Sequence, residues 1–214
     1  MPKKTEDYAK YIQENCIACL ALANRVFLTK KKQPQTIYQY STISTFKGVI
    51  EENNLWATHW AYLNDAKELK KGIEIAKEVF SEIKQIKRFT SNPVHFNVLK
   101  NYVSSLGKAD LFNKINVYVL CFSEEKDKLS LWRGYGNKYN SIATGYYMSN
   151  LGNSKNEIGT PLAGKVIYDE DRQKSMMLMY LARHYEMIEE IHEKFPKHTK
   201  KAERFLHNLF LSGI

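Results

Sequence analysis

The 214-residue chain has few of the residues that mark disulfide-rich, membrane-spanning or low-complexity proteins. Its three cysteines are too few, and odd in number, to suggest a disulfide framework. Ten glycines and five prolines exclude long flexible linkers. No run approaches the roughly 20 apolar residues of a membrane span. The basic N-terminus has no apolar h-region, which argues against a secretory signal, and we expect a cytoplasmic protein without a membrane partner.

Several catalytic motifs are also missing. The sequence contains no GxGxxG, GxxxxGK[ST] or GxSxG, so a dinucleotide fold, a P-loop NTPase and an α/β-hydrolase lose their main support. The six histidines form no HExxH motif and no compact cluster; we expect His184 in or at the rim of the core, and His192 and His198 in solvent. Cys16 and Cys19 form a CxxC inside an apolar helical stripe, where packing explains them better than metal or redox chemistry. We therefore expect no metal.

The composition predicts a packed core and a polyanionic partner. Apolar residues make up 43% of the chain, including 14 tyrosines and 10 phenylalanines, which is enough to fold as one domain over 1–214. The net charge is +9, which favours nucleic acid as a partner. The positive charge is carried mostly by lysine, which fits weak, salt-sensitive phosphate contact better than base reading by arginine.

Hydrophobic periodicity predicts an α+β fold, a small mixed sheet covered by several helices. The run 115–122 has apolar residues on both faces, so we expect it to be a central strand with 141–148 as its partner. The predicted helices span 5–29, 43–54, 64–89, 95–106, 170–194 and 198–211. The other predicted strands span 36–41, 55–59 and 162–169. We thus expect an N-terminal helix within 1–35, a motif-bearing core over 36–168 and C-terminal helices over 169–214.

The first candidate cluster combines two tyrosines with a helix start. Tyr38 and Tyr40 share one face of a predicted strand, where two phenols can hold a flat ring. Asn64 or Asp65 can cap the next long helix, and Glu68 shares a helical face with Asp65. The structural alternative is an aromatic core face followed by a capped helix with acids in its first turn.

The second candidate cluster follows the predicted central strand. Ser123 and Glu124 stand where that strand ends, and loops at strand ends often carry function. Trp132, Arg133 and Tyr135 follow on one short helical turn, with Glu124 or Asp127 as a carboxylate partner for the arginine. The stretch fits a ligand site and a structural knot equally well.

Together these motifs resemble an uncharacterised bacterial family, domain of unknown function 2971. Its members carry patterns similar to "YKY…LW…ND..E" and "CFSE..D..LMW..YA". The matching residues here are Tyr38-Gln39-Tyr40, Leu55-Trp56, Asn64-Asp65 with Glu68, Cys121-Phe122-Ser123-Glu124, Asp127, Trp132 and Tyr135, with Ile142 to Tyr147 as the next strand. The resemblance covers roughly 36–168, and Ala66 departs from the usual proline.

The strand–helix–strand opening also resembles, more loosely, ADP-ribosyltransferases and RNA 2′-phosphotransferases. That resemblance implies a split sheet, a nucleotide such as NAD, and a role in bacterial stress or phage defence. Tyr38 and Tyr40 would then stack the nicotinamide or adenine, and Arg133 would meet phosphate. Glu124 or Glu68 would stabilise an oxocarbenium-like ribose.

Two hypotheses of function follow. One is a transferase-like enzyme with a nucleotide pocket; the other is a non-catalytic module that docks nucleic acid or protein on its lysine-rich surface. In either case we expect the two clusters to line one concavity. Its predicted lining is Asn64, Asp65, Ser123, Glu124 and Arg133, with Tyr38 or Tyr40 on the wall and Trp132 and Tyr135 as further binding residues.

The C-terminal segment carries an apolar stripe of Leu206, Leu209, Phe210 and Ile214. Members of the family that this sequence resembles continue into a later segment similar to "W..E.EYR", which this sequence does not contain. If that glutamate were catalytic, the chain could bind a nucleotide without acting on it. We expect a second copy of the chain, or a separate chain, to cover 205–214.

Overall fold

The computed structural model describes residues 10–12, 14, 35–63, 67–106, 118–135, 140–151 and 164–211. The chain forms two compact units. Unit 1 comprises 1–30, 64–117 and 164–214, and unit 2 comprises 31–63 and 118–163. The expectation of a single domain over 1–214 stays a prediction.

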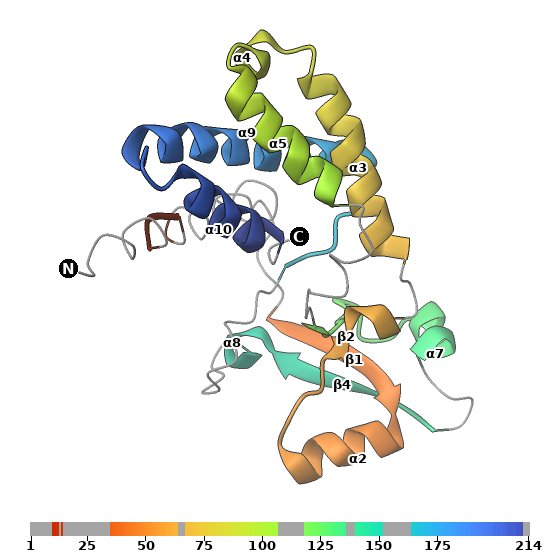
Figure 1. Cartoon of the computed structure of the whole chain (residues 1–214). Helices are drawn as coiled ribbons and strands as arrows, with labels where there is room; N and C mark the ends of the chain where they lie inside the picture. Colours follow the sequence, from red (N-terminus) through yellow and green to blue (C-terminus); the bar gives the residue numbers. More distant parts are fainter. Residues whose placement is uncertain are drawn as a thin grey trace, which may run out of the picture. The chain divides into compact units, whose positions relative to one another are not determined.

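The described elements confirm the α+β class (Figure 1). Unit 1 contains α3 (Lys67–Ile83), α4 (Lys87–Thr90), α5 (Pro93–Ser105), α9 (Glu170–Lys194) and α10 (Thr199–Leu211). Unit 2 contains β1 (Thr36–Thr42), α2 (Ile43–Glu52), β2 (Thr58–His59), η1 (Trp60–Tyr62), β3 (Tyr118–Val119), α7 (Leu129–Tyr135), β4 (Ser141–Tyr147) and α8 (Met148–Leu151). The described strands form two antiparallel pairs, β1–β4 and β2–β3, so the expectation of one mixed sheet is wrong for them.

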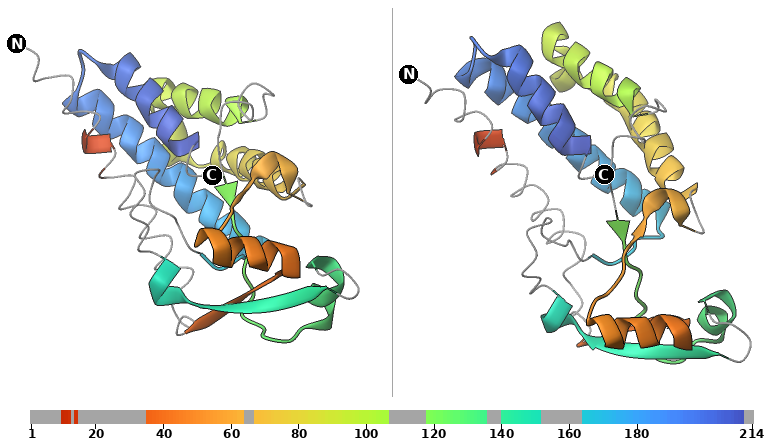
Figure 2. Two further views of the ribbon diagram at one scale, coloured as in Figure 1. Left: turned by 90° about the horizontal axis from the view of Figure 1, so that it is seen from below. Right: turned by 60° about the horizontal axis from the view of Figure 1, so that its bottom comes forward.

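Helix α9 is the centre of unit 1, where α3, α5 and α10 pack against it (Figure 1). Figure 2 shows α10 running beside α9. The helix begins after Asp169, whose carboxylate accepts the N–H of Arg172 at 2.8 Å, a standard N-cap. Its buried residues recur at helical spacing: Leu181, His184, Tyr185, Met187, Ile188 and Ile191. The predicted core position of His184 is therefore confirmed.

The helix predicted over 64–89 is two helices, because α3 ends at Ile83 and α4 begins at Lys87. Ile86 lies in the turn between them and is 41% exposed, so it does not extend the buried face of α3. The apolar residues that recur at helical spacing in α3, namely Ile73, Ala76, Val79, Phe80 and Ile83, are buried, while the side chain of Leu69 lies outside the described residues.

Helix α5 begins at Pro93, two residues before the start predicted at 95. The side chain of Asn92 accepts the N–H groups of Val94 at 3.0 Å and His95 at 3.3 Å, and Pro93 takes the first helical position. This cap fixes the first turn of α5, including the backbone of His95.

The two ends of the chain contribute to the core of unit 1. In the N-terminal segment, Lys10–Ile12 and Glu14 are helical and Ile12 is buried; the rest of the helix predicted over 5–29, with its CxxC, lies outside the described residues. In α10, Ala202 and Leu206 are buried in the same core. The expectation that Leu206 needs a partner chain is therefore wrong, while the side chains of Leu209, Phe210 and Ile214 lie outside the described residues.

In unit 2, β1 pairs with β4 over seven residues each, and α2 lies beside both strands (Figure 2). Tyr38 is opposite Gly145 and Tyr40 opposite Ala143. Among the described strands β4 pairs with β1 alone, so the prediction that 141–148 pairs with 115–122 is wrong for the part of that run that the structure describes. The run 115–122 and strand β1 both have the apolar pattern of a strand. That pattern alone does not indicate which of the two pairs with β4.

Three predicted strands are shorter than expected or missing. Of 115–122, only Tyr118–Val119 is a described strand, and Tyr118 is 62% exposed, so the buried central strand is wrong for these residues. Of 55–59, only Thr58–His59 is a strand. Residues 164–169 pair with no described strand, and Val166 and Tyr168 are exposed, so the strand predicted there is wrong for that part. An apolar run specifies a strand only where a neighbour supplies its hydrogen bonds.

Within the described residues, no helix has the length and apolar content needed to cross a membrane.

Candidate functional site

The loop after β3 is attached to β1 by backbone and side-chain hydrogen bonds. Tyr38 and Ser123 exchange two backbone N–H···O bonds of 2.8 Å each, forming an isolated antiparallel bridge. The hydroxyl of Ser123 accepts the N–H of Glu125 at 3.0 Å, which turns the chain away from the strand. Ser123 thus meets β1, as the sequence suggested, through its backbone.

Tyr40 is the centre of this attachment. It is 8% exposed, its hydroxyl donates to the carbonyl of Glu125 at 2.8 Å, and the same oxygen accepts the N–H of Lys128 at 3.1 Å. The ring of Trp132 meets it edge-on, with 4.9 Å between centroids. The indole N–H of Trp132 donates to Asp127 at 2.7 Å. We call Tyr40, Ser123, Asp127 and Trp132 the Tyr40 knot, because their polar groups are hydrogen-bonded to one another or to nearby backbone groups.

The remaining predicted residues of this stretch are at the surface. Glu124, Arg133 and Tyr135 are exposed, Tyr135 to 52%. Arg133 makes no ion pair with any described residue, and Asp127, one of its expected partners, is hydrogen-bonded to Trp132. The structure therefore joins part of the first cluster to part of the second, and their ligand-binding roles stay predictions.

The other members of the first cluster are not placed with the Tyr40 knot. Asn64 and Asp65 lie outside the described residues, and Glu68 lies in the first turn of α3 with its side chain outside them. Glu68 is in unit 1, whereas Ser123 is in unit 2. The common concavity stays a prediction.

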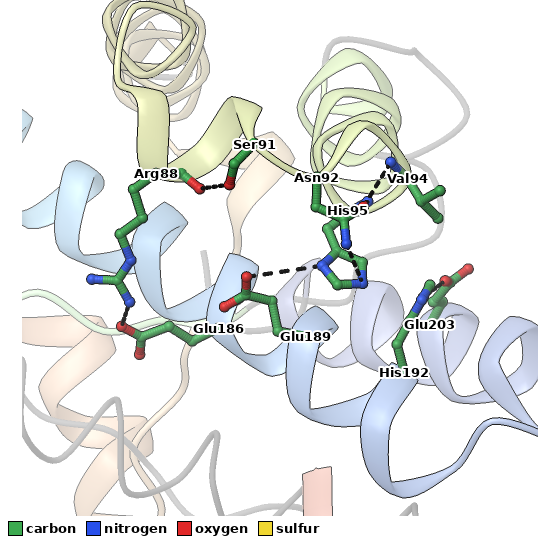
Figure 3. Close-up of polar contacts among 9 residues, drawn as sticks. All are labelled: Arg88, Ser91, Asn92, Val94, His95, Glu186, Glu189, His192 and Glu203. Atoms are coloured by element: carbon green, nitrogen blue, oxygen red, sulfur yellow. Dashed lines mark hydrogen bonds and ion pairs between the residues drawn. The ribbon is translucent and has the colours of Figure 1, made fainter.

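A second polar cluster lies in unit 1 between α5, α9 and α10 (Figure 3). The rings of His95 and His192 meet edge-on with 4.7 Å between their centroids. Nδ1 of His95 lies 3.9 Å from a carboxylate oxygen of Glu189, and Nε2 of His192 is hydrogen-bonded to Glu203. We call these four residues the histidine cluster. The side chains of His95, His192 and Glu203 are 13%, 21% and 19% exposed, so they are partly shielded and still reach solvent.

The surroundings of His95 favour its neutral ring. Its Nε2 lies 3.4 Å from the amide nitrogen of Asn92, whose oxygen is already occupied by the α5 cap. If this amide donates to Nε2, the ring proton is on Nδ1 and faces Glu189. Burial is the main cause that lowers the pKa of His95, and the charge of His192 adds to it, against opposing effects of Glu189 and Glu203.

Other carboxylates of α9 are engaged elsewhere. Glu186 accepts from Arg88 at 2.9 Å (Figure 3) and from Arg183 at 3.2 Å. Glu190 accepts from Arg183 at 3.1 Å and from the hydroxyl of Tyr11. These pairs stabilise the helix surface and leave Glu189 as the α9 carboxylate that faces His95.

A basic surface adjoins the histidine cluster in sequence. Lys197, Lys200, Lys201 and Arg204 are all exposed, and none pairs with a carboxylate of the described residues. Glu203, the acid among them, is engaged by His192. We call these four cations the basic segment.

The sequence did not identify the histidine cluster. The expectation that His192 is solvated is wrong, because its side chain is only 21% exposed and pairs with Glu203. The available signal was the spacing of Glu189 and His192, three residues apart on one helical face. The contact joins His95 to a residue about a hundred positions further along the chain, so no local pattern predicts it. Among the described residues, no group of three or more His, Cys, Asp or Glu is arranged to hold a metal ion.

The family model described as "Protein of unknown function (DUF2971)" matches residues 131–207. The match confirms the resemblance to that family over a segment that includes Trp132, Tyr135 and all of β4. It also includes His192, Glu203 and the basic segment, whereas the motif residues before Leu131 lie outside it. No curated protein and no solved structure matches the chain. The likeness to ADP-ribosyltransferases gains no support and stays a prediction.

Proposed function

We propose that the chain binds nucleic acid through the basic segment. The observation that carries this proposal is the set of four exposed cations, Lys197 in the turn from α9 into α10 and the other three in the first two turns of α10, beside a carboxylate that His192 already engages. A polyanion is the partner that such a surface attracts, and the net charge of +9 adds long-range attraction.

The position of these cations supports a ligand of negative charge. Lys200 and Lys201 lie in the first turn of α10, which contains no acidic residue. Cations at a helix N-terminus oppose the helix dipole and cost stability, whereas a phosphate placed there is favoured by both the dipole and the lysines. A bound phosphate would offset the destabilisation that these lysines cause at the start of α10 in the free protein.

The proposal is tested by fluorescence anisotropy with labelled single-stranded RNA and duplex DNA across a salt series. About four phosphate contacts give a slope of log K against log salt of about −3 for a single strand. K197Q/K200Q/K201Q should make that slope shallower by about 2. K70Q/K77Q/K100Q removes the same charge from exposed positions of α3 and α5 and is the matched control. Equal loss in both variants would mean that net charge, not this segment, drives binding.

A second candidate function is the nucleotide pocket expected from sequence. The exposure of Glu124 and Arg133 on one segment favours it, because both side chains lie at the surface. Glu124 would stabilise a ribose cation and Arg133 would hold phosphate. Incubation with NAD, followed by measurement of released nicotinamide, tests this; Glu124→Gln should abolish release and Glu125→Gln should not. An NAD titration with no heat and no nicotinamide would remove the candidate, and with it the proposed role in defence through NAD.

A further inference from the structure

We propose that the histidine cluster is a general acid–base site that cleaves the phosphodiester backbone of RNA. The inference rests on the proposed function, because the basic segment is what would hold the substrate. It adds a chemical activity and assigns its two proton-transfer groups to His95 and His192.

His95 has the arrangement of a general base. The Glu189 carboxylate lies 3.9 Å from Nδ1, beyond hydrogen-bond distance, and its charge favours the tautomer with the proton on that nitrogen, which has no hydrogen-bond partner of its own among the described residues. Nε2 is then the basic atom. In the free protein it contacts the Asn92 amide at 3.4 Å, a long hydrogen bond that a substrate hydroxyl can replace. The pKa of His95 is lowered mainly by burial, so the ring is neutral and able to accept a proton near pH 7.

His192 has the arrangement of a general acid. Glu203 bonds its Nε2 and is a counter-ion for the protonated ring, which leaves Nδ1 to donate. Two rings with centroids 4.7 Å apart can serve the same phosphodiester. The surroundings of the two rings differ, because Glu203 contacts His192 directly whereas Glu189 lies 3.9 Å from His95. Such a difference in environment is what assigns one group of a catalytic pair as the acid and the other as the base.

RNA is the substrate because it contains its own nucleophile. The cations of the basic segment attract phosphate, and Lys200 stands three residues before Glu203, on the same side of α10. A 2′-hydroxyl beside the phosphate needs only one group to remove its proton and one to protonate the leaving oxygen. Two histidines supply both, whereas DNA offers no 2′-hydroxyl.

The step balances with these groups alone. Nε2 of His95 takes the proton of the 2′-hydroxyl while the 2′-oxygen forms a bond to phosphorus. The bond from phosphorus to the 5′-oxygen breaks, and that oxygen takes a proton from His192. The products are a 2′,3′-cyclic phosphate and a 5′-hydroxyl, and solvent exchange restores both rings.

The test uses the full chain, an end-labelled single-stranded RNA and the DNA of the same sequence, with EDTA present. We expect RNA to be cut to a cyclic phosphate end and the DNA to stay intact. His95→Gln and His192→Gln should each lower the rate by about 10²–10⁴-fold, the usual contribution of general acid–base catalysis, with unchanged RNA anisotropy. His198→Gln, prepared in the same way, should keep the wild-type rate.

The outcomes separate this inference from the proposed function. RNA that is bound but not cut, or that both cluster variants cut at the wild-type rate, overturns the inference and leaves binding intact. Absence of binding to any nucleic acid removes both. Should a variant fail to fold, the wild-type pH–rate profile decides instead: a bell shape supports an acid and a base acting together, and a rate that only rises with pH overturns it.

Discussion

Replacing Tyr40 with phenylalanine should destabilise unit 2 and leave unit 1 unchanged. The substitution keeps the buried ring and its edge contact with Trp132 and removes only the hydroxyl. That oxygen makes two hydrogen bonds, at 2.8 Å to the carbonyl of Glu125 and at 3.1 Å from the N–H of Lys128. Both partners are backbone groups of the loop that the Tyr40 knot holds against β1.

The size of the effect follows from those two bonds. A net contribution of about 1 kcal/mol for each gives about 2 kcal/mol if neither backbone group finds a replacement. Glu125 and Lys128 are exposed residues, so water can hydrate part of what is lost. We therefore expect a loss of about 1.5 kcal/mol in the free energy of unfolding.

Urea denaturation followed by tryptophan fluorescence measures this unit selectively, because all three tryptophans, Trp56, Trp60 and Trp132, belong to unit 2. With a denaturant slope of about 1.5 kcal/mol/M, the midpoint should fall by about 1 M urea. Tyr62→Phe removes a hydroxyl from a side chain that is 81% exposed and is the matched control. If both variants unfold at the wild-type midpoint, the hydroxyl of Tyr40 does not hold the loop.

Two further predictions concern one position in each unit. Because the pKa of His95 is lowered in the folded state, mainly by burial, the folded protein binds that proton more weakly than the unfolded chain. The free energy of unfolding, followed by far-UV circular dichroism, should therefore fall as pH drops below about 6.5, less steeply in a variant without His95; an equal pH dependence would contradict this. A Cβ at Gly145 would lie 3.2 Å from side-chain atoms of Thr36 and Tyr38, so Gly145→Ala should lower the free energy of unfolding, followed by tryptophan fluorescence, by about 1 kcal/mol. Gly48→Ala, with open space around it in α2, should raise it, and the opposite order would refute the packing argument.

The sequence predicted elements best where a local signal set both the period and the ends. Helix α9 was expected over 170–194 and spans Glu170–Lys194, because Asp169 caps it and its apolar face keeps the helical repeat. Strand β1 was recognised in the same way, from alternation between a loop and a capped helix. In such elements the residues at each end mark where the element begins and ends, so a single sequence is enough to predict them.

Pairing and site geometry were harder to predict, because they depend on residues far apart in the chain. Nothing near β4 indicates that it pairs with β1 and not with the run that contains Tyr118. The Tyr40 knot was foreseen only as a choice between a site and a structural role. The histidine cluster joins His95 to His192, and an apolar period in α9 gives no sign of which polar residues another helix brings to it.

The histidine cluster also differs from the Tyr40 knot in what its removal should cost, and this gives a last prediction. In the knot, the polar side chains have hydrogen-bond partners. His95 instead places a titratable ring at a junction of three helices, where an apolar ring of similar shape would pack as well and avoid the cost of burial. His95→Phe keeps the edge contacts with His192 and with Tyr185, whose centroid is 6.1 Å away. Glu189 is 43% exposed and can be hydrated, and Asn92 still caps α5.

We therefore expect the free energy of unfolding of His95→Phe at pH 7 to stay the same or to rise by about 1 kcal/mol, while RNA cleavage is lost. Thermal melting and the cleavage assay on the same preparation measure both. A loss of about 3 kcal/mol or more would mean that His95 is retained for stability, as in a buried network whose partner has been removed, and the case for a catalytic role would lose its physical basis.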